Sequence, residues 1–531
     1  MSWAQAKERW ITTLRDERAP LVVALVAVLV HLRAIRNGYA FDDVAIVGHP
    51  LVHSIRTLPE ALVAPWWYAG NRLYRPLSLL SIGIDRAIGG GAPWLPHTVN
   101  VLLHGTIAFL VARLCLRFLP RFAALVAATL FALLPVHAEA VATVVGRAEL
   151  LAALAILLLL LRVTRDEQPT PRSYLVAALL SAAALAGKES GATAPAIVLA
   201  AAWAWPAQRR NAVRWMMSAA VGTGLLLVAR VVVLGSLAGD LPHPFFRGMT
   251  AATRIPVALA LLPRMATMLF APVPPAVEDV PSLAAALHPD PLMVAAGATL
   301  VLLALVLALR HVRAPSALTL GSCVAAAALA PTSNLLFAAG AVTGRTLYSP
   351  SIGAALMVGA LAALLMETRF RIAVPYVAVT MSVWAAAITV REVRVWRDTP
   401  TMLATMVARQ PNDYRAYELL AYSARDAGRD SEAVRHFSAA IDRFPADPEM
   451  LTDAATVALR LRDSARASGW LTAAVRADAR AVRARTRLYT IMRARGDSAK
   501  AAALLLEGLR ADPEQRTWRH LLGPVGRSSV R

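Results

Sequence analysis

Residues 21–50 read LVVALVAVLVHLRAIRNGYAFDDVAIVGHP, an apolar run followed closely by two adjacent aspartates. Apolar runs of about 17–25 residues, the length that crosses a hydrocarbon core of about 30 Å, recur from Leu21 to Val390. Backbone polar groups inside a bilayer must be satisfied within the segment, which a helix does. The pattern therefore predicts an all-α, polytopic helical membrane protein.

The composition agrees with a membrane location. Of the 531 residues, 57% are hydrophobic and only 17% are charged, which is far too few charges for a soluble protein of this size. The net charge of +21 comes from arginines at the ends of spans and in the C-terminal helices. That placement is typical of topology signals and anionic lipid headgroups, and no nucleic-acid motif is present. We therefore expect membrane lipid and no nucleic acid as a partner.

The two cysteines, Cys115 and Cys323, both lie in apolar segments. They give neither a disulfide framework nor a metal cluster, and we expect them to fill the core. Nothing in the sequence indicates a divalent metal, so no metal ligand is predicted.

Eleven spans are predicted, at 21–35, 98–117, 122–138, 149–163, 173–187, 191–206, 212–235, 291–310, 316–335, 347–366 and 371–391. Basic residues before Leu21 predict a cytoplasmic N-terminus. The segment 253–272 is apolar but contains three prolines, and we interpret it as re-entrant or interfacial. The first loop and the C-terminal region then lie on the outer side of the membrane.

The sequence changes character near residue 400, which predicts a membrane domain at 1–397 and a second domain at 398–531. In the second domain Pro411, Pro445 and Pro513 recur in a 34-residue period, as do Ala433, Ala467 and Ala501. This period and its small residues predict a tetratricopeptide-repeat α-solenoid. Its units are placed at about 414–447, 448–481 and 482–515.

Polar residues beside the spans are the candidates for chemistry, because charge near a bilayer is costly. The catalytic candidates are Asp42 and Asp43. The candidates for donor-phosphate or substrate binding are Arg75, His104, His137, Glu139, Arg147, Glu149, Lys188, Arg230 and Arg345. Arg72, Asn100 and Glu189 accompany them. On the predicted topology nearly all of these residues fall on the outer side, which indicates a single site.

The charges of this set indicate a reaction class. A carboxylate can act as a general base on a hydroxyl group, or bind a metal. Arg and Lys can hold a phosphate and stabilise it as it departs. A phosphate beside eleven apolar helices suggests a lipid phosphate, and hence group transfer from a lipid carrier at the outer face.

Two other functions compete with this interpretation. A transporter or lipid flippase is one, although the hydropathy shows no inverted repeat and the polar residues gather at one face. The other is a non-catalytic membrane scaffold that recruits partners through its repeats, although eleven spans exceed what an anchor requires. Residue by residue, each candidate could also be a solvated helix end or a packing ion pair.

Six motifs resemble a known family. In order, they are FDD (41–43), YRPLSLLSIGIDRAIGG (74–90), HTVNVLLHG (97–105), FALLPVHAEAVATVVGRAELLAAL (131–154), GKESG (187–191) and GRTLYSPSIG (344–353). With the C-terminal repeats, they resemble the transmembrane-and-tetratricopeptide O-mannosyltransferase family, whose members are glycosyltransferases of the GT-C fold. The resemblance covers about residues 36–365 and the repeats.

The resemblance implies a function and a site. It implies a polyprenyl-phosphate sugar as the donor, with mannose as the sugar and a protein serine or threonine as the acceptor. It also implies that one carboxylate of Asp42 and Asp43 activates the acceptor hydroxyl, and we favour Asp42. By the same resemblance Arg75, His137, Glu139, Arg147, Lys188 and Arg345 face the active cavity.

The chain departs from animal members in having about three repeats, so acceptor recognition can differ. Its Ala- and Arg-rich composition indicates a bacterial source. The expected location is then the bacterial plasma (inner) membrane, with undecaprenyl or a similar phosphate as the carrier and the site and repeats extracytoplasmic.

Overall fold

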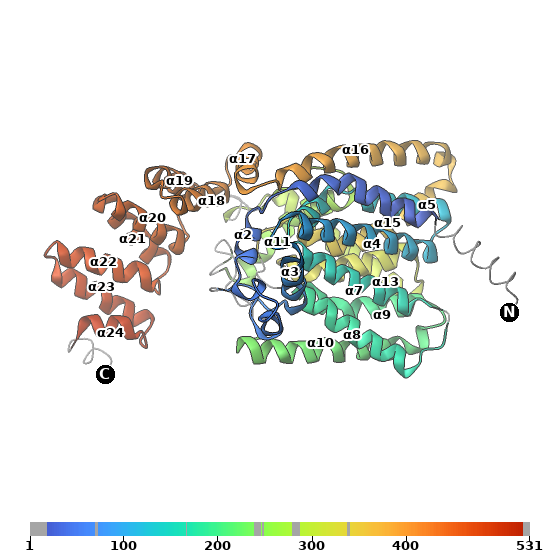
Figure 1. Ribbon diagram of the computed structural model, residues 1–531, viewed down its shortest axis with the longest axis horizontal. Coiled ribbons are helices and arrows are strands. Elements are labelled where there is room, and N and C mark those ends of the chain that lie inside the picture. Colours follow the sequence, from blue (N-terminus) through green and yellow to red (C-terminus); the bar gives the residue numbers. More distant parts are fainter. Residues whose placement is uncertain are drawn as a thin grey trace, which may run out of the picture. The chain divides into compact units, whose positions relative to one another are not determined.

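The computed structural model describes residues 18–68, 73–165, 167–237, 246, 249–278, 287–336 and 340–523. Within these ranges the regular elements are helices, which confirms the predicted all-α class (Figure 1). The chain divides into two compact units, of which the first comprises Met1–Asp279 and Pro289–Met402, and the second Val280–His288 and Leu403–Arg531. Each unit is described by itself.

Seven helices in the described part of the first unit are long and apolar enough to cross a membrane, which confirms a multi-pass membrane protein. They are Arg18–Arg36, α4 (Trp94–Phe118), Arg209–Leu234 with α10 (Ala212–Leu234), α11 (Ala251–Phe270), α13 (Pro291–Arg313), Arg345–Met366 with α15 (Tyr348–Met366), and Arg369–Val395 with α16 (Ala373–Val395). The count rises to eight if α5 (Arg121–Leu133) and Pro135–Ala142, a pair bent by 44°, are taken as one broken span.

Four of the predicted spans correspond to shorter helices. These are α7 (Arg147–Val163), α8 (Pro171–Gly187), α9 (Ala194–Ala204) and α14 (Ala317–Leu329). A 3-10 turn at Glu189–Thr193 separates α8 from α9, and another at Ala330–Thr332 follows α14. Because such turns interrupt the helical hydrogen-bond ladder, the apolar stretch is longer in sequence than the regular helix.

Close packing of the first unit depends on small residues. Gly353 of α15 lies against α14 so tightly that a Cβ atom there would be 2.3 Å from the carbonyl oxygen of Gly321. Gly222 of α10 lies equally close to Ala178 of α8, at 1.9 Å from its carbonyl oxygen. Small residues of this kind let helix backbones approach where lipid gives no hydrophobic driving force.

The segment predicted to be re-entrant forms the single helix α11, with Pro256 and Pro263 inside it. Two contacts place the end of this helix and the residues that follow it. The indole N–H of Trp384, near the middle of α16, donates a 3.0 Å hydrogen bond to the carbonyl of Pro272, just past the end of α11. Pro275 then lies against Gly344, at the start of the α15 span. Because α11 is also one of the seven helices long and apolar enough to cross a membrane, the re-entrant interpretation of 253–272 stays a prediction.

The last helix of the first unit ends against the first loop. The side chain of Asn37 donates to the carbonyl of Val393 over 3.1 Å, and the amide of Gly38 donates to the carbonyl of Arg397 over 2.9 Å. The amide of Phe41 donates to the hydroxyl of Thr399 over 2.9 Å. The end of α16 therefore lies beside the start of α2 (Asp42–Val47).

The second unit is a series of short helices. They are α17 (Thr399–Arg409), which leads in from the first unit, α18 (Tyr414–Asp426), α19 (Asp430–Arg443), α20 (Pro448–Arg460), α21 (Ser464–Ala477), α22 (Val482–Ala494), α23 (Ser498–Ala511) and α24 (Arg516–Leu522). Gly428, Arg462 and Gly496, at one position of the 34-residue period, all have positive φ. The assignment of these helices as tetratricopeptide repeats stays a prediction.

Candidate functional site

The two aspartates at the start of α2 occupy different environments. Phe41, just before them, has a φ of 53°, a conformation that is strained for a bulky residue. Successive residues on a helix point in directions about 100° apart. The Asp42 side chain is accordingly 24% exposed, whereas Asp43 is fully buried.

Asp43 is held by the backbone of another segment. Its Oδ1 atom accepts a 2.9 Å hydrogen bond from the amide of Val145, and its Oδ2 atom has no partner in the described part of the chain. Burial raises the pKa of the Asp43 carboxyl to about 7, because the hydrogen bonds from Val145 and Val144 offset only part of the cost of burying the charge. This burial and the backbone contact favour a role for Asp43 in anchoring α2 over direct contact with a substrate.

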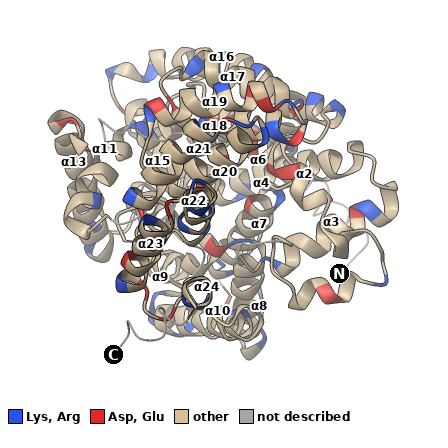
Figure 2. Cartoon of the chain, turned by 90° about the vertical axis from the view of Figure 1, so that its left-hand side faces the viewer, with Lys and Arg blue, Asp and Glu red and all other residues tan. Residues whose placement is uncertain are grey.

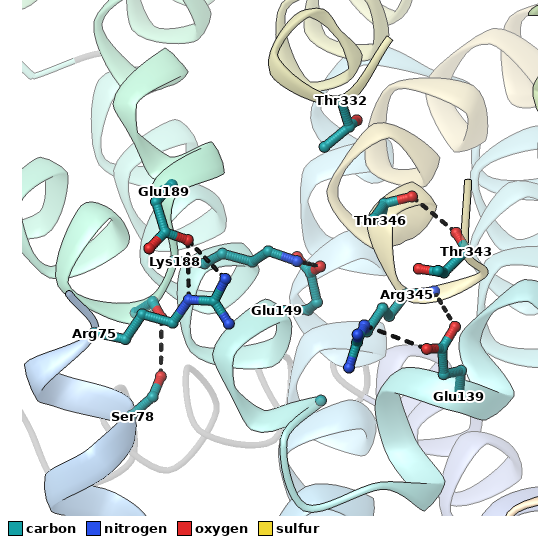
Figure 3. Close-up of polar contacts among 12 residues, drawn as sticks. Arg75, Ser78, Glu139, Glu149, Lys188, Glu189, Thr332, Thr343, Arg345 and Thr346 are labelled. Carbon is teal, nitrogen blue, oxygen red and sulfur yellow. Dashed lines mark hydrogen bonds and ion pairs between the residues drawn. The ribbon is translucent and has the colours of Figure 1, made fainter. Parts of the chain in front are cut away.

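Asp42 instead pairs with an arginine from the distant α15 span. Its Oδ2 atom lies 2.9 Å from Nη2 of Arg345. The same arginine contacts Glu139 twice: its amide donates to Oε2 over 2.9 Å, and its Nε lies 3.3 Å from Oε1. Glu139, on the short helix α6 (Ala138–Ala142), therefore fixes both the backbone and the side chain of Arg345 (Figure 3).

A second group of charges surrounds Glu189, which follows α8. Arg75, at the start of α3 (Pro76–Gly89), approaches Glu189 Oε2 at 2.8 Å, and Arg230 of α10 approaches Oε1 at 3.5 Å. Lys188 contacts Glu149 at the start of α7. The burial of Glu189 acts to raise its pKa, but the charge and hydrogen bonds of Arg75 outweigh this and lower it.

The two groups belong to one site. Figure 3 shows Arg75, Lys188 and Glu189 on one side of the view, with Arg345 and Glu139 on the other. Burial and then the charges of Arg75 and Arg345 hold the pKa of Lys188 well below its ordinary value, so the two groups are electrostatically coupled. In Figure 2 charged residues of both signs are seen beside α2 and α6, as they are elsewhere in that view. We call Asp42, Glu139 and Arg345 the acidic half, and Arg75, Lys188 and Arg230, with Glu149 and Glu189, the basic half.

Three predicted site residues lie elsewhere. Arg147 is fully buried, and its guanidinium donates to Asn100, Ser81, Asp85 and the carbonyl of Pro96. This arrangement favours a packing role over phosphate binding.

The other two are histidines in the interior of the bundle. His104 bonds to the hydroxyl of Tyr348 at 2.7 Å, and His137 to the hydroxyl of Ser351 at 2.8 Å. Their rings pack 5.3 Å apart, between centroids. Both side chains are fully buried, so they support the helices around the site rather than face it.

Sequence reasoning missed several contributors. Asp85, the ionic partner of Arg147, was not singled out, although it lies in the family-like block 74–90. The strain at Phe41 had no signal in the sequence. Arg72 lies outside the described residues. In the part of the chain that the structure describes, no three His, Cys, Asp or Glu side chains are placed to hold a metal ion.

The fold and the site define a polytopic helical membrane protein with opposed acidic and basic groups at one end of its bundle. No protein-family model matches the chain. The curated relatives that it matches nevertheless share one name. It is 31% identical over 186 residues to the protein O-mannosyl-transferase TMTC3 of Mus musculus, which is 33% of this chain and 20% of the relative.

Two further relatives carry the same name. The chain is 35% identical over 196 residues to the protein O-mannosyl-transferase TMTC1 of Mus musculus, covering 33% of this chain and 21% of the relative. It is 36% identical over 185 residues to Tmtc2 of Drosophila melanogaster, covering 32% of this chain and 20% of the relative. These matches confirm the predicted resemblance to the O-mannosyltransferase family, although they span only about a fifth of each relative's length.

Proposed function

We propose that this chain is a membrane glycosyltransferase of the GT-C type, which moves a sugar from a polyprenyl-phosphate carrier to a hydroxyl acceptor. We propose mannose as the sugar and a protein serine or threonine as the acceptor, since the relatives are named protein O-mannosyl-transferases. The site is proposed to face the extracytoplasmic side of a bacterial plasma membrane.

The observation that carries the proposal is the division of charge within one site. Three basic residues, Arg75, Lys188 and Arg230, gather around Glu149 and Glu189. Opposite them stands a partly exposed carboxylate, Asp42, held by Arg345. Transfer from a phosphate to a hydroxyl needs a cationic region for the leaving phosphate and a base for the hydroxyl.

The proposed reaction is a single displacement. The acceptor oxygen forms a bond to C1 of the sugar, and the bond between C1 and the phosphate oxygen breaks with its electron pair going to the phosphate. The acceptor proton goes to Asp42. Asp42 Oδ2 is engaged by Arg345, and Oδ1 has no protein hydrogen bond among the described residues, which leaves it available for that proton.

The basic half stabilises the leaving group. A phosphodiester carries one negative charge, and the departing polyprenyl phosphate gains a second. Fixed cations stabilise that added charge more in the transition state than in the bound donor. The apolar helices around the site suit the long prenyl chain of such a carrier.

The test uses the purified full-length chain in detergent or nanodiscs, with a panel of polyprenyl-phosphate sugars and a serine- and threonine-rich peptide. Release of polyprenyl phosphate together with glycosylated peptide is expected for one donor. Failure to turn over any donor, with the wild-type chain folded, would contradict the proposal.

The basic half has its own test. Arginine binds phosphate through a planar fork that lysine lacks. Arg75→Lys should therefore raise the donor KM by about tenfold, as expected for loss of about 1.4 kcal/mol of binding. Arg56→Lys, an exposed arginine in the same first loop, is the matched control and should leave the KM unchanged. Equal donor KM values for Arg75→Lys and wild type would exclude Arg75 from the phosphate site.

A further inference from the structure

The turn at residues 143–146, between α6 and α7, contacts Asp43 of α2 directly and is linked to Asp42 through Glu139 and Arg345. Its Val145 amide holds Asp43, as described above, and its first residue, Thr143, closes the helix that carries Glu139. The Thr143 hydroxyl donates to the carbonyl of Glu139 over 2.8 Å and accepts from the amide of Gly146 over 3.2 Å. The Thr143 side chain thus joins the last residue of the turn, Gly146, to the helix that carries Glu139.

The turn is fixed from outside by Asn100 of α4. The Asn100 amide nitrogen donates to the carbonyl of Thr143 over 2.6 Å, and its oxygen accepts from Nε of Arg147 over 2.7 Å. Arg147 in turn contacts Asp85 of α3. Asn100 and Arg147 are fully buried and Thr143 is 1% exposed, so water does not compete for these bonds.

We propose that Thr143, Asn100 and Arg147 are positioning residues, which hold the Asp42 carboxylate in place through the turn at 143–146. The inference rests on the proposed function, because it assumes that Asp42 is the base. The turn holds α2 through Asp43, and it holds α6, whose Glu139 orients Arg345. The same turn therefore holds the helix that carries Asp42 and the helix whose glutamate positions Arg345.

This assignment predicts a kinetic signature that separates it from donor binding. A displaced base lowers kcat, because a shift of about 1 Å in a reacting group can cost about 100-fold in rate. The donor KM should stay close to the wild-type value, because two of the three basic residues, Arg75 and Arg230, pair with Glu189, outside this turn. Loss of a phosphate ligand would instead raise the donor KM as well as lower kcat.

The principal variant is Thr143→Val, which removes the hydroxyl and keeps the shape of the side chain. We expect kcat to fall by about tenfold at a donor KM close to that of wild type, with a lower melting temperature because two buried hydrogen bonds are lost. Thr143→Ser, which keeps the hydroxyl, should restore kcat to within about twofold of wild type. Thr106→Val is the matched control, because the exposed Thr106 hydroxyl makes the same kind of helix bond, over 2.9 Å to Leu102, away from the turn.

A double-mutant cycle tests whether the effect runs through Asp42. In the Asp42→Asn background, assayed over long incubations, Thr143→Val should lower the residual rate less than about twofold. The same cycle with Asn100→Ala provides a second measurement if Thr143→Val folds poorly. Equal losses in both backgrounds, or a raised donor KM at unchanged kcat, would overturn the inference alone. An inactive wild type would instead overturn the proposed function.

Discussion

Asp42 and Asp43 are neighbours in the chain, yet their carboxylates meet different surroundings. Asp42 is partly exposed and ion-paired with Arg345, whereas Asp43 is buried against the amide of Val145. A base must reach its substrate, and only Asp42 has a carboxylate oxygen that is both accessible and without a protein partner among the described residues. The two residues should therefore respond differently to the same substitution.

For turnover, we expect Asp42→Asn to lower kcat at least about 100-fold, as is typical for the loss of a general base. Asp43→Asn can still accept the hydrogen bond from Val145 and should stay within about fivefold of wild type, because loss of one buried polar contact typically costs about 1 kcal/mol. Both rates are measured with the donor identified in the panel. Equal losses in the two variants would show that the pair acts as a unit.

For stability, we expect the Asp43 carboxyl to make the fold weaken as the pH rises. Its pKa is about 7 in the folded chain, against an ordinary value of 3.8. Between those values the folded state retains a proton that the unfolded state has released, so the stabilisation is complete below about pH 4 and is lost as the pH rises through 7.

The measurement is a melting curve in detergent at pH 5.5 and at pH 8. Wild type should melt at a lower temperature at pH 8, and Asp43→Asn should reduce the difference because its amide does not titrate. An unchanged pH dependence in Asp43→Asn would assign the effect to another group.

At the scale of elements, the turn between α6 and α7 depends on one close approach. A Cβ atom on Gly146 would lie 2.1 Å from the carbonyl oxygen of Ala140, a backbone atom that cannot rotate away. Any side chain at this position must therefore displace α6 or the turn. Because α6 carries Glu139 and the turn holds Asp43, the displacement reaches the acidic half of the site.

Gly146→Ala should accordingly lower kcat by about tenfold or more, and lower the melting temperature. Gly224→Ala in α10 is the matched control, because a Cβ atom there meets no other atom within 4 Å. Alanine also favours a helix more than glycine does, so that control should be neutral or slightly stabilising. Full activity in Gly146→Ala would show that α6 can shift without disturbing Arg345.

The sequence predicted the helices and the charged residues of the site better than it predicted which side chains contact one another. Apolar runs located the helices, since the length needed to cross a bilayer is a strong constraint. The charged residues of both halves were also identified, because charge beside apolar helices is rare. Residue types alone could not separate Arg345, which faces Asp42, from Arg147, which donates to four acceptors, three of them buried. That distinction depends on which helix faces which, and sequence order does not give it.

At the scale of the molecule, the course of the membrane unit bears on where the repeats lie. α16 ends beside the first loop, where Gly38 contacts Arg397 and Phe41 contacts Thr399. The chain therefore leaves the membrane unit at the end that carries Asp42. We predict that the repeats are on the same side of the membrane as the site, which we expect to be the extracytoplasmic side.

The measurement is labelling of single cysteines in intact cells with a membrane-impermeant thiol reagent. Glu60→Cys in the first loop and Ala446→Cys in the second unit are both at exposed positions. Each is made in a background in which Cys115 and Cys323 are replaced by alanine. Labelling at both positions is expected, whereas labelling at only one would place the loop and the repeats on opposite sides.

The bonds between the first loop and the end of α16 join residues 356 and 358 positions apart in the chain. During synthesis the carboxylate of Asp42 emerges early, whereas Thr399, which holds the strained Phe41 beside it, is made only after the last membrane helix. A nascent chain that stops before α16 contains every charged residue of the site but cannot yet hold the base in position. Under the proposed function, we therefore expect chains that stop before α16 to be inactive toward a lipid-linked sugar.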